Sequence, residues 1–288
     1  MAYRTDLALE SEQRVSASGE VPGISKRERR CPGTGFEVTE ITVETDEAAE
    51  LLGKPRGRYI TVKCRSGRLS ELCGSASARA ECIAAELRGL IGVPERVLVA
   101  GLGNMQITPD SLGPRTASGI LATRHIKRLA KDLDTSELSD VTVISAGVMG
   151  QTGLESQELV RAVCREAEPE LVIVVDALAC SELGHLGSTV QLCSTGISPG
   201  SGVANARSEL SEKTLGVPTV AIGIPTVTDC AVIAQASGGQ IGQEYAGMIV
   251  TPRDIDSLVQ RSAGLLSLGI NLALHPTLTA GELMMLTS

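Results

Sequence analysis

The sequence predicts an α/β protein with a mostly parallel central sheet, helices on both faces of that sheet and an attached N-terminal β-hairpin. Short apolar runs alternate with helical segments from residue 96 onward, which is typical of parallel strands buried on both faces. Before that region, two β-branched runs alternate apolar and polar residues, as half-buried strands do. Hydrophobic residues make up 42% of the 288 positions, with one Phe and no Trp. We therefore expect a core of aliphatic side chains.

The elements follow in order. Residues 36–44 (FEVTEITVE) and 58–64 (RYITVKC) predict the two strands of the hairpin, and 76–91 predicts a helix of good helix formers. The alternating part then predicts strand 96–103, helix 112–130 with Pro114 in its first turn, strand 141–147, helix 156–167, strand 170–178 and strand 219–225. Residues 184–205 are rich in glycine and predict a long functional loop.

The chain divides by composition at about residue 35. Residues 1–35 are polar and charged and predict a loosely attached leader. Residues 36–288 predict a single α/β domain.

Charge and composition exclude several classes of function. The net charge of −8 and pI near 5.1 argue against binding to nucleic acid or to an anionic membrane surface. No apolar stretch reaches the length of a membrane span, and the N-terminus does not resemble a signal peptide. The eight cysteines contain no CxxC pair and are expected to be reduced thiols of a cytoplasmic protein.

Candidate site residues follow two predicted parallel strands, where such sheets place their ligands. Asp110 belongs to the segment GLGNMQITPDSLGP (101–114), and Asp176 ends the apolar run at 171–175. A carboxylate in that position is expected to be desolvated and to need a partner or a role. The glycines of a third segment, 194–207, are candidates for binding an extended substrate through the backbone: Gly196, Gly200 and Gly202.

Two carboxylates at neighbouring strand ends can hydrolyse a peptide bond. One acts as the base toward water, and the other, protonated, polarises the carbonyl group. Alternatively the pair holds a metal ion that activates water, with His185 completing the shell. From spacing alone, Asp110 is more simply a helix cap. Asp229, after the strand at 219–225, is a candidate third acidic participant but is also more simply a helix cap.

Other chemistries have weaker signals. The GLGN segment lacks the third glycine of a dinucleotide fingerprint, and Pro109 interrupts it where the cofactor helix should begin. There is no GxSxG elbow, and the cysteines lie mostly in apolar or helical runs. No cofactor is therefore expected.

Taken together, five segments resemble the germination protease family. They are GLGNMQITPDSLGP (101–114), SAGVMGQTGLES (145–156), VVDALA (174–179), STGISPGSGVANAR (194–207) and GVPTVAIGIPTVTD (216–229). Each is weak alone, but their order makes the match specific, and the likeness extends to NLALHPTL (271–278).

The resemblance implies an endopeptidase that degrades small acid-soluble spore proteins when germination begins, with a fold similar to that of hydrogenase-maturation peptidases. It implies an atypical aspartic mechanism in which Asp110 and Asp176 match the family's essential aspartates. It also implies a location in the forespore or spore core and a homo-oligomer, with a tetramer among the options.

The resemblance further implies a zymogen that trims its own N-terminus. Family cleavage sites have an acidic residue, then a hydrophobic one, then alanine, with glutamate further on. Asp6-Leu7-Ala8-Leu9-Glu10 has this pattern, which predicts self-cleavage between Asp6 and Leu7. A metal-dependent peptidase and a non-catalytic binding protein for spore proteins are the alternatives.

Overall fold

The computed structural model describes residues 5–17, 19, 21–71, 76–129, 135–136, 138–200, 208–240, 242, 245 and 247–287. The strands are β1 (Ile24–Cys31), β2 (Phe36–Val43), β3 (Gly57–Cys64), β4 (Arg96–Leu102), β5 (Asp140–Gly147), β6 (Leu171–Cys180), β7 (Thr189–Cys193), β8 (Thr219–Asp229) and β9 (Ile249–Val250). The helices are α1 (Ala8–Ser16), α2 (Asp46–Leu52), α3 (Ala76–Ile91), α4 (Leu112–Ser118), α5 (Arg124–Leu129), α6 (Met149–Thr152), α7 (Ser156–Ala167), α8 (Glu212–Leu215), α9 (Cys230–Ala236), α10 (Ile255–Leu274) and α11 (Ala280–Leu286). Among these helices, none is both long and apolar enough to cross a membrane.

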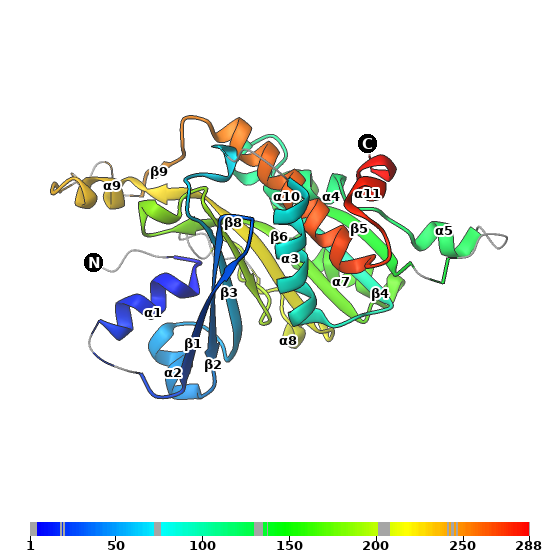
Figure 1. The fold of residues 1–288 in the computed structure, drawn as a ribbon, viewed down its shortest axis with the longest axis horizontal. Coiled ribbons are helices and arrows are strands. Elements are labelled where there is room, and N and C mark those ends of the chain that lie inside the picture. Colours follow the sequence, from blue (N-terminus) through cyan, green and yellow to red (C-terminus); the bar gives the residue numbers. More distant parts are fainter. Residues whose placement is uncertain are drawn as a thin grey trace.

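The strands form one sheet in the order β1-β2-β3-β7-β8-β6-β4-β5, with β9 paired to β8 (Figure 1). The half that contains β5, β4, β6 and β8 is parallel, as expected. The other half is antiparallel, and β7 joins the two by pairing with both β3 and β8. The predicted α/β fold is confirmed.

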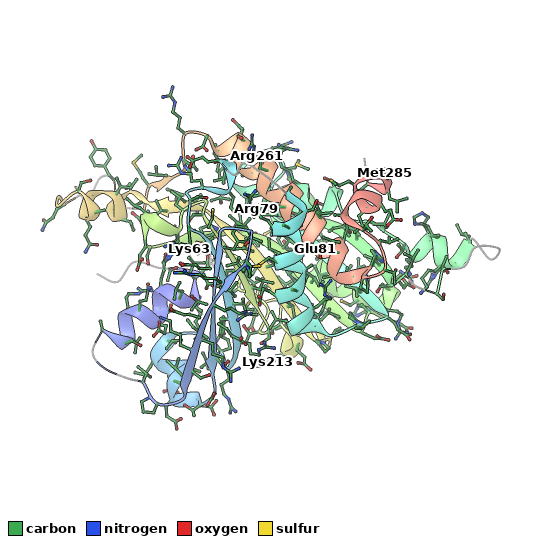
Figure 2. All side chains as sticks on the ribbon, viewed as in Figure 1. Lys63, Arg79, Glu81, Lys213, Arg261 and Met285 are labelled. Carbon is green, nitrogen blue, oxygen red and sulfur yellow. The ribbon has the colours of Figure 1, made fainter. Side chains whose placement is uncertain are left out.

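Helices cover both faces of the parallel half, which explains why its inner strands β4 and β6 are almost entirely apolar. Val97 and Val99 of β4 pack in the cluster that contains α3 and α10, which lie side by side in Figure 1. Leu98 and Ala100, which point to the opposite face, pack in the cluster with α7 and α8. Figure 2 shows Arg79 of α3 and Arg261 of α10 at the same end of this helix pair, where both side chains line one cavity.

The predicted hairpin is present but is larger than expected. β2 pairs with β3 in the antiparallel sense, as predicted, with α2 inserted between them. β1 extends the same sheet by pairing with β2. The expectation of a loosely attached leader is wrong for residues 8–16 and 24–31, which form α1 and β1. Leu7 and Ala8 are both fully buried.

Two further expectations are corrected. The helix expected at 112–130 is broken into α4 and α5, because Asn271 of α10 bonds the backbone N–H of Leu121 and the carbonyl oxygen of Gly119 and replaces helical partners there. The loop expected at 184–205 contains the strand β7, whose Gln191 side chain bonds the hydroxyl of Thr61 across the sheet.

Candidate active site

Asp110 and Asp176 line the same cleft, which has a volume of about 430 Å³. The two residues come from neighbouring strands: the loop after β4 carries Asp110, and β6 itself carries Asp176. Gly200 and Asp6 line the same cleft. The sequence-based expectation that the two aspartates meet is therefore consistent with the geometry.

Asp176 is a nearly buried carboxylate, with 5% of its surface exposed. Its Oδ1 accepts a hydrogen bond from the backbone N–H of Ala177 at 2.9 Å. β6 continues to Cys180 along β8, so Asp176 does not end its strand as the sequence suggested. Pairing of β6 with β4, however, stops at Val175. Asp176 is thus the first residue of β6 beyond β4, which opens space on that side for the cleft.

Asp110 is held by the loop that leaves β4. It ends a short 3₁₀ turn, η2 (Thr108–Asp110), and its Oδ2 accepts the backbone N–H of Asn104 at 2.8 Å. The buried Thr226 of β8 donates its hydroxyl to the carbonyl oxygen of Pro109, which ties the turn to the sheet. Ser111, rather than Asp110, is the N-cap residue of α4.

Glycines allow this loop to lie close to the strands. Gly103 has a φ of +113°, and a Cβ there would collide with the carbonyl oxygen of Asp110. A Cβ on Gly113 would lie 2.5 Å from the carbonyl oxygen of Val175, well inside ordinary contact. The close approach of α4 to β4 and β6 therefore sets the position of Asp110 relative to Asp176.

The chain's own N-terminal segment lies beside β6 at the cleft and is hydrogen-bonded to this strand. The N–H of Asp6 donates to the carbonyl oxygen of Ala179 at 3.0 Å, and the N–H of Ala179 donates to Asp6 Oδ2 at 2.8 Å. Leu7 packs on Leu178 and Cys180. The predicted processing site, Asp6–Leu7, is thereby placed next to the cleft that holds Asp110 and Asp176.

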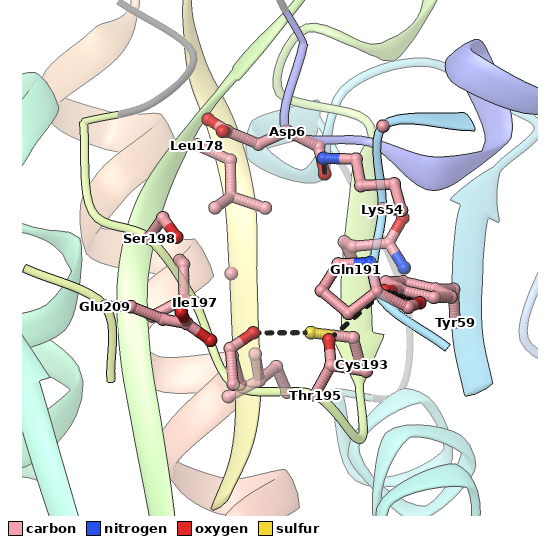
Figure 3. Close-up of a pocket in the computed structure, with 16 residues that line it drawn as sticks. Asp6, Lys54, Tyr59, Leu178, Gln191, Cys193, Thr195, Ile197, Ser198 and Glu209 are labelled. Atoms are coloured by element: carbon pink, nitrogen blue, oxygen red, sulfur yellow. Dashed lines mark hydrogen bonds between the residues drawn. The ribbon is translucent and has the colours of Figure 1, made fainter. Parts of the chain in front are cut away.

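Lys54 holds the other side of this segment. Its Nζ donates to the carbonyl oxygen of Asp6 at 3.0 Å and to that of Thr5 at 3.3 Å. Figure 3 shows Lys54 meeting Asp6 at one end of a neighbouring pocket of about 190 Å³. Burial lowers the pKa of Lys54, while the nearby Asp6 acts in the opposite direction. Sequence analysis missed Lys54, because a single lysine in a Gly/Pro-containing connection carries no signal.

The three candidate glycines do not lie at one site. Gly200, with a φ of +72°, lines the cleft of the two aspartates. Gly196, with a φ of +77°, lines the neighbouring pocket instead, and a Cβ there would collide with the carbonyl oxygen of Leu210. Gly202 lies outside the described residues. Substrate binding by these glycines stays a prediction.

The remaining candidates have other partners. Asp229 is the N-cap of α9 and accepts the N–H of Ala231 at 2.8 Å, which confirms the capping interpretation. His185 is buried, and its Nδ1 lies 2.8 Å from a carboxylate oxygen of Glu10. Within the described part of the chain, no group of three or more His, Cys, Asp or Glu side chains is arranged to hold a metal ion. In the sequence Glu10 was noticed only as part of the predicted cleavage pattern, and its contact with His185 gave no signal because the two residues are 175 positions apart.

This arrangement is suited to hydrolysis of a peptide bond. It combines two carboxylates in one cleft, one of them nearly buried, with an extended peptide fixed beside them through backbone hydrogen bonds. Burial favours a protonated carboxyl group, and a neighbouring carboxylate favours it further, so a pair of this kind can supply one base and one acid.

Comparison with known proteins shows which family the sequence resembles. The germination protease family model matches residues 3–238. A germination protease of Caldanaerobacter subterraneus subsp. tengcongensis is 36% identical, over 98% of this chain and 97% of the relative. One of Clostridium perfringens is 33% identical over 97% of each chain, and one of Bacillus velezensis is 40% identical over 80% of this chain and 64% of the relative.

Among solved structures, a [NiFe] hydrogenase maturation protease from Thermococcus kodakarensis aligns with 64% of this chain and 98% of its own, at 19% identity and a TM-score of 0.37. The sequence comparisons cover most of the chain, including the segments that carry Asp110 and Asp176. The chain belongs to the germination protease family.

Proposed function

We propose that this member of the germination protease family is an endopeptidase that degrades small acid-soluble spore proteins and hydrolyses the peptide bond with Asp110 and Asp176. The observation that carries the proposal is the shared cleft, which is lined by Asp110, Asp176 and Asp6. The family assignment supports a peptidase role in germination.

In this mechanism the ionised carboxylate of the pair takes a proton from the attacking water. The other carboxyl group, protonated, donates a hydrogen bond to the carbonyl oxygen of the substrate and stabilises the charge that develops there. A coupled pair titrates as a unit, so the two roles belong to the pair rather than to one named residue. After collapse of the tetrahedral intermediate, the proton goes to the leaving amine.

The proposal includes self-processing between Asp6 and Leu7. Lys54 and Ala179 fix the acidic residue before this bond from its two sides, through hydrogen bonds to the Asp6 carbonyl oxygen, N–H and carboxylate. The segment is thus held as a substrate would be, and it blocks the cleft until it is cut. The homo-oligomer and the spore-core location stay predictions.

The test is digestion of a purified small acid-soluble spore protein, followed by mass spectrometry of the new termini. We expect Asp110→Asn and Asp176→Asn to lose at least about 10³-fold in activity, because each removes an essential partner in proton transfer. Asp229→Asn is the matched control, since this carboxylate caps α9 outside the cleft. Full activity in either cleft variant contradicts the carboxylate pair. Loss of activity with a chelator, restored by a divalent ion, supports the metal alternative, and binding without new termini supports a non-catalytic protein.

A further inference from the structure

A hydrogen bond between two side chains joins the loop that carries Asp110 to the helix that follows the neighbouring strand β5. Gln151 of α6 donates from its Nε2 to Oδ1 of Asn104 at 2.7 Å. Asn104 lies in the loop after β4, and its backbone N–H donates to Asp110 Oδ2 at 2.8 Å. Two hydrogen bonds in series therefore lead from α6 to the carboxylate of Asp110.

Asn104 also organises the rest of this loop. Its carbonyl oxygen accepts the N–H of Ile107 at 3.0 Å, and the N–H of Asp110 donates to the carbonyl oxygen of Ile107 at 2.9 Å. Asn104 Oδ1 accepts the N–H of Gln106 at 3.0 Å. Because a backbone N–H can only donate, the Asn104 atom that meets it is the oxygen, and Gln151 presents its NH₂ group to the same oxygen. The position of Asn104 thus reaches Asp110 both directly and through the loop backbone.

The segment 145–156, one of the five that carry the family resemblance, folds so that Gln151 reaches this loop. Gly147, the last residue of β5, has a φ of +66°. A Cβ there would lie 3.4 Å from Gln151 Oε1 and 3.2 Å from Thr152 Cγ2, so the glycine leaves room for α6 to turn back over the end of the strand. Ser156 Oγ fixes this turn by donating to the carbonyl oxygen of Gly147 at 3.1 Å. Gln151 itself is exposed, so packing of the core does not require a glutamine at this position.

The contact lies where pairing of β4 with β5 ends. The last pair in register is Leu102 with Gly147, and Gln151 meets the loop just beyond it. On the other side of the loop, the hydroxyl of Thr226 in β8 donates to the carbonyl oxygen of Pro109 at 2.8 Å. The loop is therefore attached to the sheet from two sides, by β8 and by the helix that follows β5.

We infer that Asn104 and Gln151 are positioning residues for Asp110 in the peptidase reaction. Gln151 fixes Asn104, and the N–H of Asn104 fixes one oxygen of the Asp110 carboxylate, which limits rotation of that group in the cleft. The inference rests on the proposed function, because both residues act only through Asp110. Loss of the contact should slow proton transfer, which depends on the placement of the carboxylate, and should leave the affinity for substrate largely unchanged.

The test compares the full chain with Gln151→Met, with Asn104→Ala and with both substitutions. Methionine has nearly the shape of glutamine but no N–H donor. The values of kcat and KM are measured separately for digestion of a purified small acid-soluble spore protein, with thermal unfolding as the check on folding. Gln235→Met is the matched control, because Gln235 is an exposed glutamine of the short helix α9 and does not line the cleft.

We expect Gln151→Met to lower kcat about tenfold and to change KM by less than about twofold, since only the placement of Asp110 is affected. Asn104→Ala should lower kcat at least as much. Adding Gln151→Met to Asn104→Ala should then cost less than about twofold more, because both substitutions break the same contact. The inference is overturned by a wild-type kcat in Gln151→Met, by a change confined to KM, or by the same loss of kcat from Gln151→Met in both backgrounds.

Nuclear magnetic resonance of ¹⁵N-labelled protein tests the same contact without turnover. The amide proton of Asn104 should resonate downfield because it is bonded to Asp110, and Asp110→Ala should move it upfield by removing the acceptor. Gln151→Met should move it in the same direction by at least half as much, and Gln235→Met should leave it in place. A signal that Gln151→Met does not move overturns the inference. If the wild-type chain does not digest the spore protein, the proposed function fails, whereas a signal that responds to Gln151→Met still establishes that Gln151 positions Asp110.

Discussion

Replacement of Gly113 by alanine should reduce activity without unfolding the protein, because this glycine sets the distance between the two halves of the candidate active site. Gly113 lies in the first turn of α4, directly after the loop that carries Asp110. A Cβ added there would lie 2.5 Å from the carbonyl oxygen of Val175, the residue before Asp176, and closer still to the carbonyl oxygen of Leu102.

The size of the effect follows from this geometry. Ordinary contact of a Cβ begins at 3.4 Å, and the opposing atoms belong to the backbone of two central strands. Because those strands cannot give way, α4 must move away from the sheet by about 1 Å, and it carries Asp110 with it. A misplacement of about 1 Å at a reacting group costs on the order of 10²-fold in rate. The strain should also lower the free energy of unfolding by about 1–3 kcal/mol.

The assay is kcat/KM for a peptide with the sequence of residues 1–17, together with urea unfolding of the same preparations. Gly89→Ala is the matched control, because Gly89 lies in helix α3 and a Cβ there meets nothing within 4 Å. It should keep full activity and gain up to about 1 kcal/mol from helix propensity. Wild-type activity in Gly113→Ala would refute the argument that close packing of α4 positions Asp110.

Three other predictions follow from contacts outside the carboxylate pair. Asn271→Ala should lower the free energy of unfolding by about 1–3 kcal/mol in urea titrations, because it leaves two partly buried backbone groups without their partner. Gln260→Ala, whose side-chain bond is exposed, should change it by less than about 0.5 kcal/mol. The pKa of Glu10 is held below its ordinary value, so its contribution to docking of α1 is present above that value and is lost as pH falls through the lower, folded-state pKa. The protection of the α1 amides from hydrogen exchange, expressed relative to their intrinsic rates at each pH, should therefore fall on acidification and not on raising the pH. Lys54→Met should slow self-cleavage by about tenfold, because it removes a charged hydrogen-bond donor from the Asp6 carbonyl oxygen. Intact mass measures the cleavage, and Lys213→Met, at an exposed lysine, is the control that should have no effect.

The parallel half of the fold was predictable because its strands are buried on both faces. The runs at 96–103 and 170–178 are apolar at every position that meets α3 and α10 or α7 and α8, so no tertiary information was needed to assign them. β7 was not predictable, since its Gln191 is polar and its partners, β3 and β8, are distant in sequence.

The break between α4 and α5 was missed for a similar reason. The residues around it favour a helix, but Asn271 reaches across from α10 and satisfies the backbone at Gly119 and Leu121. A contact over about 150 residues leaves no periodic pattern in the sequence, so tertiary structure overrides local propensity at this point.

Some residues of the candidate site could likewise be predicted from the sequence, and others could not. Asp176 was noticeable because a carboxylate interrupts an apolar run, whereas Asp110 needed the family resemblance to be distinguished from a helix cap. Lys54 gave no local signal, and Glu10 was noticed only as part of the cleavage pattern, because each acquires its contacts only when the N-terminal segment docks beside β6. Residues that act through a docked segment are visible only in the folded chain.

The central claim is that the cleft with Asp110 and Asp176 hydrolyses the bond between Asp6 and Leu7. Its most direct test is to incubate the purified full chain in water enriched in ¹⁸O and to record intact mass and the released peptide. The account predicts a new N-terminus at Leu7 and one ¹⁸O atom in the α-carboxyl group of the released Asp6, with neither product from Asp176→Asn. A chain that stays intact, or an Asp176→Asn variant that is cut at the wild-type rate, would contradict it.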